Sequence, residues 1–152
     1  MSSQTVHRTY TIKEAAALTG LPASTLRYYE SIGVIEPIGR GASSKHRVYS
    51  EDDLNQLVWV SCLSATGMSV TDMRQYVANR DLGEAGANEQ IELLTTQRDR
   101  LAIEAMQIKI RQRYVDLKIA YWHAVAAGDQ ERAGLLADEA RSLTDELRVR
   151  KQ

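Results

Sequence analysis

Cys62 is the chain's only cysteine, and it is the side chain best suited to covalent chemistry. A lone thiol can act as a nucleophile or as a sensor of electrophiles, but it cannot form an internal disulfide. A soft-metal site needs at least two thiolates or imidazoles, whereas His7, His46 and His123 are scattered along the sequence. None of these histidines is placed to act as a base for Cys62, and no phosphate-cradling motif is present. We therefore expect no enzymatic activity, no metal and no cofactor.

Basic residues are concentrated near the N-terminus, which is the first indication of a nucleic-acid partner. The net charge of the 152 residues is −1, but residues 1–49 carry six basic and three acidic side chains. Residues 50–81 carry two basic and five acidic side chains. A basic head on an otherwise neutral chain is typical of a protein that binds DNA through one end. There is no signal-peptide core and no apolar run near the roughly 20 residues of a membrane helix, so we expect a cytoplasmic protein with no membrane partner.

Two short helices are expected in the basic region. Thr11 and Glu14 have the spacing of a capping box, and the helix that they begin should end near Gly20. Pro22 suits the first turn of a second helix, over residues 23–31. Two helices joined so tightly have the geometry of a helix-turn-helix, whose second helix enters the major groove. An ordinary helical hairpin is the alternative.

A glycine-bearing loop over residues 37–50 is expected to follow as a wing, with short strands at residues 34–35 and 47–49. Ser50 and Ser69 are each followed by acidic residues, which is typical of helix N-caps, so a third and a fourth helix should begin there. The head would then hold four helices and a wing.

The second helix and the wing carry side chains that can donate to phosphates and base edges. A run of charges is more often simply solvated, but here it lies beside a helix-turn-helix. Of the adjacent pair Tyr28 and Tyr29, one is expected to lie in the core. The expected DNA-binding residues are Thr11, Ser24, Thr25, Arg27, Tyr28, Arg40, Lys45, His46 and Arg47.

One long helix is expected over residues 88–125, after a hinge at residues 81–87. Its apolar residues recur every seven positions, which is the seam of a left-handed coiled coil. A single chain would expose too much of this stripe, so a homodimer is expected. A second apolar stripe predicts that a final helix packs on the back. The seam residues are Leu94, Leu101, Ile108, Val115 and Trp122; Ile91, Ala105 and Ile119 lie beside them, Arg98 and Gln112 interrupt the pattern, and Ile103, Ile110 and Leu117 form the second stripe.

The stretches "YTIKEAAALTGLPASTLRYYESIGVIEP", "HRVYSEDDL" and "LSATGMSVTDMRQYV" resemble the MerR family of bacterial transcription regulators. The resemblance implies a mainly α fold: a winged helix-turn-helix DNA-binding head (residues 9–80), a long antiparallel coiled-coil dimerisation helix (87–126) and a short C-terminal helix (129–149). It also implies a homodimer on a pseudo-palindromic operator in double-stranded promoter DNA, which it distorts so that RNA polymerase can use the promoter.

The same resemblance assigns roles to individual residues of the head. Arg27 and Tyr28 are expected to meet the DNA backbone and base edges from the recognition helix, and Arg47 and Tyr49 to fix the wing to phosphates. The wing reads "GASSKHRVYS" where the family more often has "GYRRYS", so it is longer here. That extra length leaves the contacts of its tip open.

Two interpretations of Cys62 stay open. The stretch "CLSATGMS" resembles the single-cysteine NmlR/AdhR branch of the family, which implies a stress-response regulator whose thiol senses aldehydes or nitrosating species. Physical chemistry favours core packing instead. Cys62 follows Leu54 and Val58 on an apolar stripe, and it lies near a helix C-terminus, where the helix dipole disfavours an anion.

Overall fold

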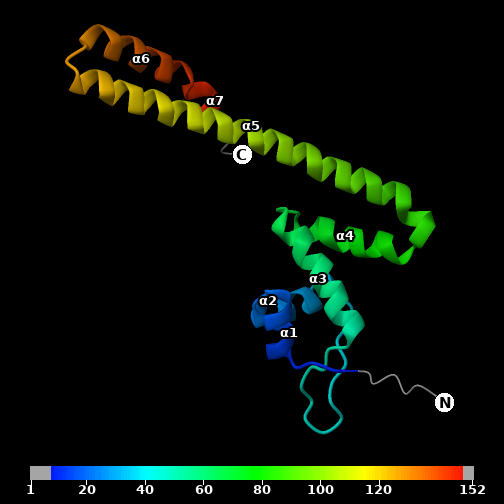
Figure 1. Cartoon of the computed structure of the whole chain (residues 1–152). Helices are drawn as coiled ribbons and strands as arrows, with labels where there is room; N and C mark the ends of the chain where they lie inside the picture. Colours follow the sequence, from blue (N-terminus) through cyan, green and yellow to red (C-terminus); the bar gives the residue numbers. More distant parts are fainter. Residues whose placement is uncertain (1–7, 149–152) are drawn as a thin grey trace, which may run out of the picture. The chain divides into compact units, whose positions relative to one another are not determined.

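The structure is a computed structural model that describes residues 8–148, and these residues are mainly helical (Figure 1). Its internal contacts divide the chain into two units, with the boundary after Leu94. Among the described residues, no helix is long and apolar enough to cross a membrane. The first unit contains α1 (Ile12–Thr19), α2 (Ala23–Ser31), α3 (Glu51–Ala65), α4 (Val70–Asp81), the 3₁₀ helix η1 (Gly83–Gly86) and the first turns of α5 (Ala87–Ala126).

Side-chain caps begin α1, α3 and α4 where the sequence predicts them. The Thr11 hydroxyl accepts from the Glu14 backbone N–H, and the Glu14 carboxylate accepts from the Thr11 N–H, both at 3.2 Å. Ser50 and Asp53 form the equivalent pair at the start of α3. Each capping box satisfies two backbone donors that a bare helix end would leave unpaired. Gly20, with φ of +74°, ends α1 in the left-handed conformation that suits glycine.

The core of the head lies between α1, α2 and α3. Leu26 on α2 and Leu57 on α3 are fully buried there. Of the adjacent tyrosines, Tyr29 is the buried one, and its hydroxyl lies 3.1 Å from the Ser64 hydroxyl on α3. Tyr28 is 52% exposed. The two side chains of α2 that point inward therefore fix which side of this helix faces solvent.

The wing is held by isolated bridges rather than by strands. Tyr10 and Tyr49 exchange two backbone hydrogen bonds of 2.9 Å, and Arg40 pairs with Arg47 across the loop. The predicted strand at residues 34–35 is wrong, because the Val34 N–H donates back to the Tyr29 carbonyl and both residues of that segment are buried as coil.

The expected hinge at residues 81–87 is an ordered elbow. η1 leads directly into α5, and buried Asn79 on α4 holds the junction together. Its amide donates to the Gln90 side chain at 3.2 Å and accepts from Gln75 at 2.7 Å, while Gln90 donates to the Tyr76 carbonyl at 2.9 Å. A buried amide with satisfied donors and acceptors fixes one geometry, because any other arrangement leaves a polar group unpaired. The first turns of α5 thus belong to the head.

In the second unit, α6 (Gln130–Ser142) and α7 (Thr144–Arg148) follow the remainder of α5. α6 folds back along α5 of its own chain, as Figure 1 shows, after a turn in which Gly128 has φ of +71°. Leu117 is buried against Leu136, and Arg113 on α5 pairs with Glu139 on α6. The predicted second stripe is therefore covered in part by the C-terminal helix, which divides into two at Leu143.

Two glycine variants test the elbow. A Cβ at Gly86 would lie 2.2 Å from the Asn79 carbonyl oxygen, so Gly86→Ala is expected to destabilise the head by about 1–3 kcal/mol. Gly134→Ala on α6 is the control, because its Cβ meets nothing within 4 Å and alanine favours a helix by about 0.5–1 kcal/mol. Urea unfolding followed by circular dichroism measures both variants. A Gly86→Ala protein as stable as the wild type would contradict a tight elbow.

Candidate DNA-binding surface

The outer side of α2 presents polar side chains because Leu26 and Tyr29 turn inward. Ser24, Arg27 and Tyr28 are exposed, and Thr25 is half-buried. Pro22, at the N-cap of α2, has no side-chain group that could cap the helix. The backbone N–H groups of the first turn are therefore available to a phosphate oxygen, which the helix dipole also attracts.

A basic hollow lies where α1, α2 and the wing meet. It has a volume of about 210 Å³, and three guanidinium groups and an imidazole surround it. Guanidinium groups grouped in this way fit the planar, bidentate recognition of a phosphate. The fold thus brings together five of the residues expected from the sequence to bind DNA. The lining residues are Thr11, Ile12, Arg27, Arg40, His46 and Arg47.

Glu30 orients one of these guanidinium groups. Arg47 Nε lies 3.2 Å from Glu30 Oε2, and the side chains are only 21% and 12% exposed. The Glu30 carboxylate also accepts from the Ile38 N–H at 3.4 Å. One carboxylate therefore ties the recognition helix to both ends of the wing. The partners of Glu30 lie eight and 17 positions away, so no local sequence pattern indicates this role.

Tyr49 occupies a different place from the one expected. It is fully buried, and its hydroxyl oxygen has no partner among the described residues. Burial raises the pKa of Tyr49 above its ordinary value, with Arg47 and Arg27 acting in the opposite direction. The phosphate contact expected of Tyr49 is therefore not supported, because the wing folds its side chain into the core of the head.

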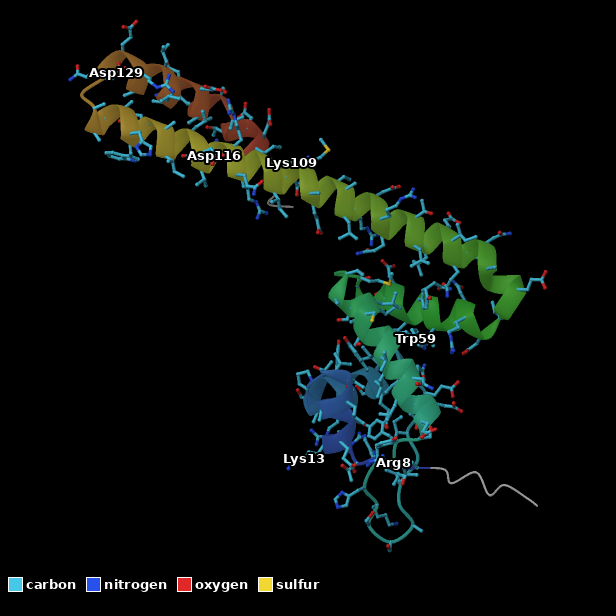
Figure 2. All side chains as sticks on the ribbon, viewed as in Figure 1. Arg8, Lys13, Trp59, Lys109, Asp116 and Asp129 are labelled. Carbon is cyan, nitrogen blue, oxygen red and sulfur yellow. The ribbon has the colours of Figure 1, made fainter. Side chains whose placement is uncertain are left out.

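The wing tip and Arg8 add basic side chains beside the hollow. Lys45 adopts a φ of +61°, and both Lys45 and His46 are exposed. The Arg40 guanidinium donates to the Lys45 carbonyl at 3.3 Å and so braces the tip. Arg8, labelled in Figure 2, was not among the residues expected to bind DNA; its guanidinium lies 5.1 Å from the centre of the Tyr10 ring.

Cys62 lies on the outer side of α3 and is exposed. The inward side of this helix is formed by Leu57 and Val60, whereas Val58, four residues before the thiol, is 47% exposed. The interpretation of Cys62 as a core residue of the head is therefore wrong. α3 is apolar nearly all round, and such a sequence does not reveal which side faces inward. Among the described residues, no group of three His, Cys, Asp or Glu side chains is arranged to hold a metal ion.

Comparison with known proteins identifies the class to which this head belongs. Residues 10–80 match the MerR HTH family regulatory protein. An uncharacterized HTH-type transcriptional regulator of Haemophilus influenzae is 30% identical over 122 residues, which cover 78% of this chain and 87% of that protein. The HTH-type transcriptional regulator AdhR of Bacillus subtilis is 32% identical over 90 residues, covering 59% of this chain and 64% of AdhR.

A solved structure agrees with these matches. It is HiNmlR, a MerR family regulator lacking the sensor domain, bound to promoter DNA. The two structures superpose with a TM-score of 0.66 at 27% sequence identity, and the match covers 85% of this chain and 96% of the HiNmlR chain. The chain belongs to the MerR family and is a DNA-binding transcriptional regulator, which confirms the predicted family and fold class.

Arg27→Ala tests the basic hollow. Loss of a charged contact in each head of a dimer should weaken operator binding by at least about tenfold and reduce the slope of log affinity against log salt by about two. Binding is measured by fluorescence anisotropy on a duplex selected from random sequences with the wild-type protein. Arg141→Ala is the control, because Arg141 is an exposed arginine of α6 whose ion pair is with the exposed Asp138. Equal affinity and salt dependence for Arg27→Ala and the wild type would refute the assignment.

Proposed function

We propose that the chain works as a homodimer whose two heads bind a pseudo-palindromic operator and distort promoter DNA for RNA polymerase. The basic hollow of the head carries the proposal. In each head, α2 enters the major groove and presents Ser24, Arg27 and Tyr28 to base edges and backbone. The hollow takes a phosphate between Arg27, Arg40 and Arg47, and Lys45 follows the neighbouring backbone.

The exposed seam of α5 supports the homodimer. All five seam residues are exposed in the single chain, from 39% for Leu101 to 63% for Trp122. α6 covers a different stripe, the one that contains Leu117 and Ala124. An apolar stripe running along so much of a helix is typical of a helix that buries it against a partner.

Deformation of the operator is the means of regulation that suits this arrangement. Two heads joined through a dimer bind two half-sites at a fixed separation. DNA whose half-sites do not match that separation must bend or twist to engage both. HiNmlR, which this chain resembles in structure, is bound to promoter DNA. For the present chain we propose no catalytic activity, no resident metal and no cofactor, and its DNA target places it in the cytoplasm.

A thiol switch through Cys62 is a second proposal, and the exposure of Cys62 is the observation that favours it. An aldehyde would be captured when the thiolate sulfur adds to the carbonyl carbon and the carbonyl oxygen takes up a proton, giving a hemithioacetal. The added group would stand on α3, the helix that packs on both α1 and α4. A change in that packing would alter how the head is presented to DNA.

Charged substitutions in α5 test the homodimer. Ile108→Asp places a carboxylate in the seam and should give a monomer with much weaker operator binding, because a dimer would bury the charge unpaired. Ile103→Asp is the matched control, since Ile103 is 57% exposed on the same helix but lies off the seam. Size-exclusion chromatography with light scattering measures the mass of each variant. A dimeric Ile108→Asp protein would contradict the proposal.

Cys62→Ser tests the thiol switch separately. The variant should bind the selected operator with unchanged affinity, because the substitution is nearly isosteric on an exposed surface. It should lose any change in transcript level that formaldehyde causes with the wild-type protein and RNA polymerase in vitro. If the variant responds as the wild type does, or if neither responds, the thiol switch is refuted and the DNA-binding function stands.

A further inference from the structure

The basic hollow of the head contains a group whose charge can change near neutral pH. It is lined by the guanidinium groups of Arg27, Arg40 and Arg47 and by the imidazole of His46. Guanidinium groups keep their positive charge at every physiological pH. Histidine, in contrast, ordinarily gains or loses its proton between about pH 5 and pH 8. The charge of the hollow therefore depends on the protonation state of His46.

We propose that His46 is a proton-dependent phosphate ligand, so that operator binding takes up protons and becomes tighter as the pH falls. The protonated imidazole is a cation with two N–H donors, and it completes a set of four positive groups around the phosphate. In the neutral imidazole one ring nitrogen has no proton to donate. The inference rests on the proposed phosphate contact in the hollow and adds to it the uptake of protons and a response to acid.

The wing holds the backbone of His46 beside the arginines. The Gly41 N–H donates to the His46 carbonyl at 2.9 Å, and the His46 N–H donates to the Ser44 hydroxyl at 3.3 Å. The preceding residue is held as well, because the Arg40 guanidinium donates to the Lys45 carbonyl at 3.3 Å. The His46 side chain is exposed, so a phosphate can reach it. A ligand whose backbone is already fixed loses less conformational entropy on binding.

The charged groups that line the hollow with His46 come from α2 and from the wing. α1 contributes Thr11 and Ile12, which carry no charge. Glu30 faces this region from α2, and its carboxylate is paired with the Arg47 guanidinium at 3.2 Å. A phosphate of the DNA therefore supplies the negative charge with which the protonated imidazole pairs.

Tyr49, the buried titratable group beside this site, contributes no pH dependence of its own. Its ring lies in the core of the head, close enough to Arg47 and Arg27 to be affected by their charges. Burial nevertheless raises the pKa of Tyr49 above its ordinary value of about 10. The phenol therefore stays neutral throughout the range in which histidine titrates.

Thermodynamic linkage fixes the sign of the effect. A phosphate beside the imidazole stabilises its protonated form, so the complex binds more protons than the free protein and the free DNA together. The phosphodiesters of DNA stay ionised over this range, so the titrating group belongs to the protein. Affinity must then rise as the pH falls, by at most about tenfold per pH unit for each proton taken up. The proposed homodimer carries one His46 in each head and can take up two protons.

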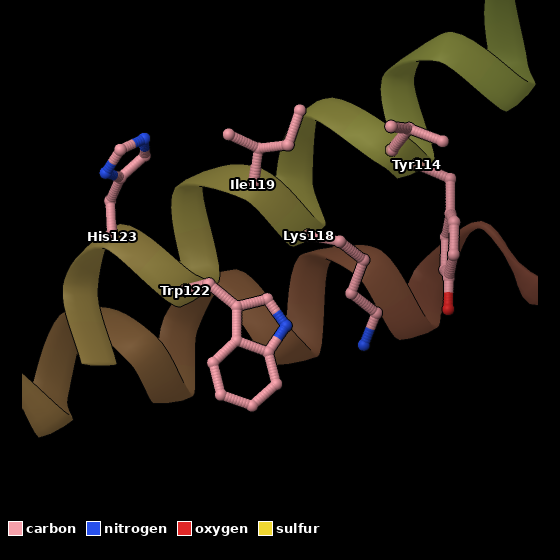
Figure 3. Close-up of a pocket in the computed structure, with 6 residues that line it drawn as sticks. Tyr114, Lys118, Ile119, Trp122 and His123 are labelled. Carbon is pink, nitrogen blue, oxygen red and sulfur yellow. The ribbon is translucent and has the colours of Figure 1, made fainter. Parts of the chain in front are cut away.

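Variants with a fixed charge at this position test the proposal. Fluorescence anisotropy on the selected duplex, at constant ionic strength, should show wild-type affinity rising about tenfold or more from about pH 8 to about pH 5.5. His46→Gln should bind more weakly at acid pH and lose this dependence, whereas His46→Arg should bind tightly at both ends of the range. His123→Gln is the matched control, because His123 is an exposed histidine of α5 that lines a different hollow with Ile119 and Trp122 (Figure 3). It should keep the wild-type dependence.

Calorimetry counts the protons directly. Titration of the duplex at about pH 6.5 in two buffers of different ionisation enthalpy should show proton uptake by the wild type and none by His46→Gln. Circular dichroism at both ends of the pH range checks that each variant is folded. Wild-type affinity that does not change with pH, or a pH dependence that persists in His46→Gln or disappears in His123→Gln, overturns the proposal and leaves operator binding intact. A folded wild type that selects no duplex at any pH removes the proposed function as well.

Discussion

The apolar seam of α5 is the constraint on which the rest of the molecule depends. α5 is 40 residues long, and only its first turns pack in the head. In the second unit, α6 covers one apolar stripe of α5 within the same chain, and Leu117 and Leu136 are buried between the two helices. The seam is left open, so its hydrophobic free energy is available only through a second chain. Because a second chain covers the seam, the dimer has two heads that can bind DNA together.

The head is built so that a buried framework positions a charged exterior. Tyr49 and Leu26 are fully buried, and the Glu30–Arg47 pair joins the wing to α2 at its edge. Phosphate binding needs several cations at one point, and cations repel each other unless the fold holds them there. The acidic Glu30 within this basic surface reduces that repulsion and fixes the direction of one guanidinium. Where α4 leads into α5, buried Asn79 hydrogen-bonds to Gln90 and so fixes the position of the first turns of α5.

Much of this arrangement could be predicted from the sequence because it depends on local signals. Thr11 and Ser50 act through residues three positions away, so the starts of α1 and α3 are visible as short motifs. The seven-residue period of the seam is likewise local, and it predicts α5 almost to its ends. Features that depend on distant partners could not be predicted. The burial of Tyr49 requires the wing to fold back, and the ordered elbow requires Gln90 to reach Asn79.

Cys62 illustrates the same limit within one helix. Its neighbours on α3 are apolar on most sides, so periodicity does not decide between an inward and an outward thiol. The structure decides it through the packing of Leu57 and Val60. The expected contact of Tyr49 with phosphate is not supported for a similar reason, since a tyrosine beside a basic wing can equally well be core or surface and here it is buried.

Sedimentation equilibrium of the wild-type protein, from nanomolar to micromolar concentration, tests the central claim most directly. The open seam predicts a species of twice the chain mass of 17.0 kDa, which dissociates only at the lowest concentrations. A species of 17.0 kDa throughout that range would contradict it, because the seam would then stay exposed to water without a partner.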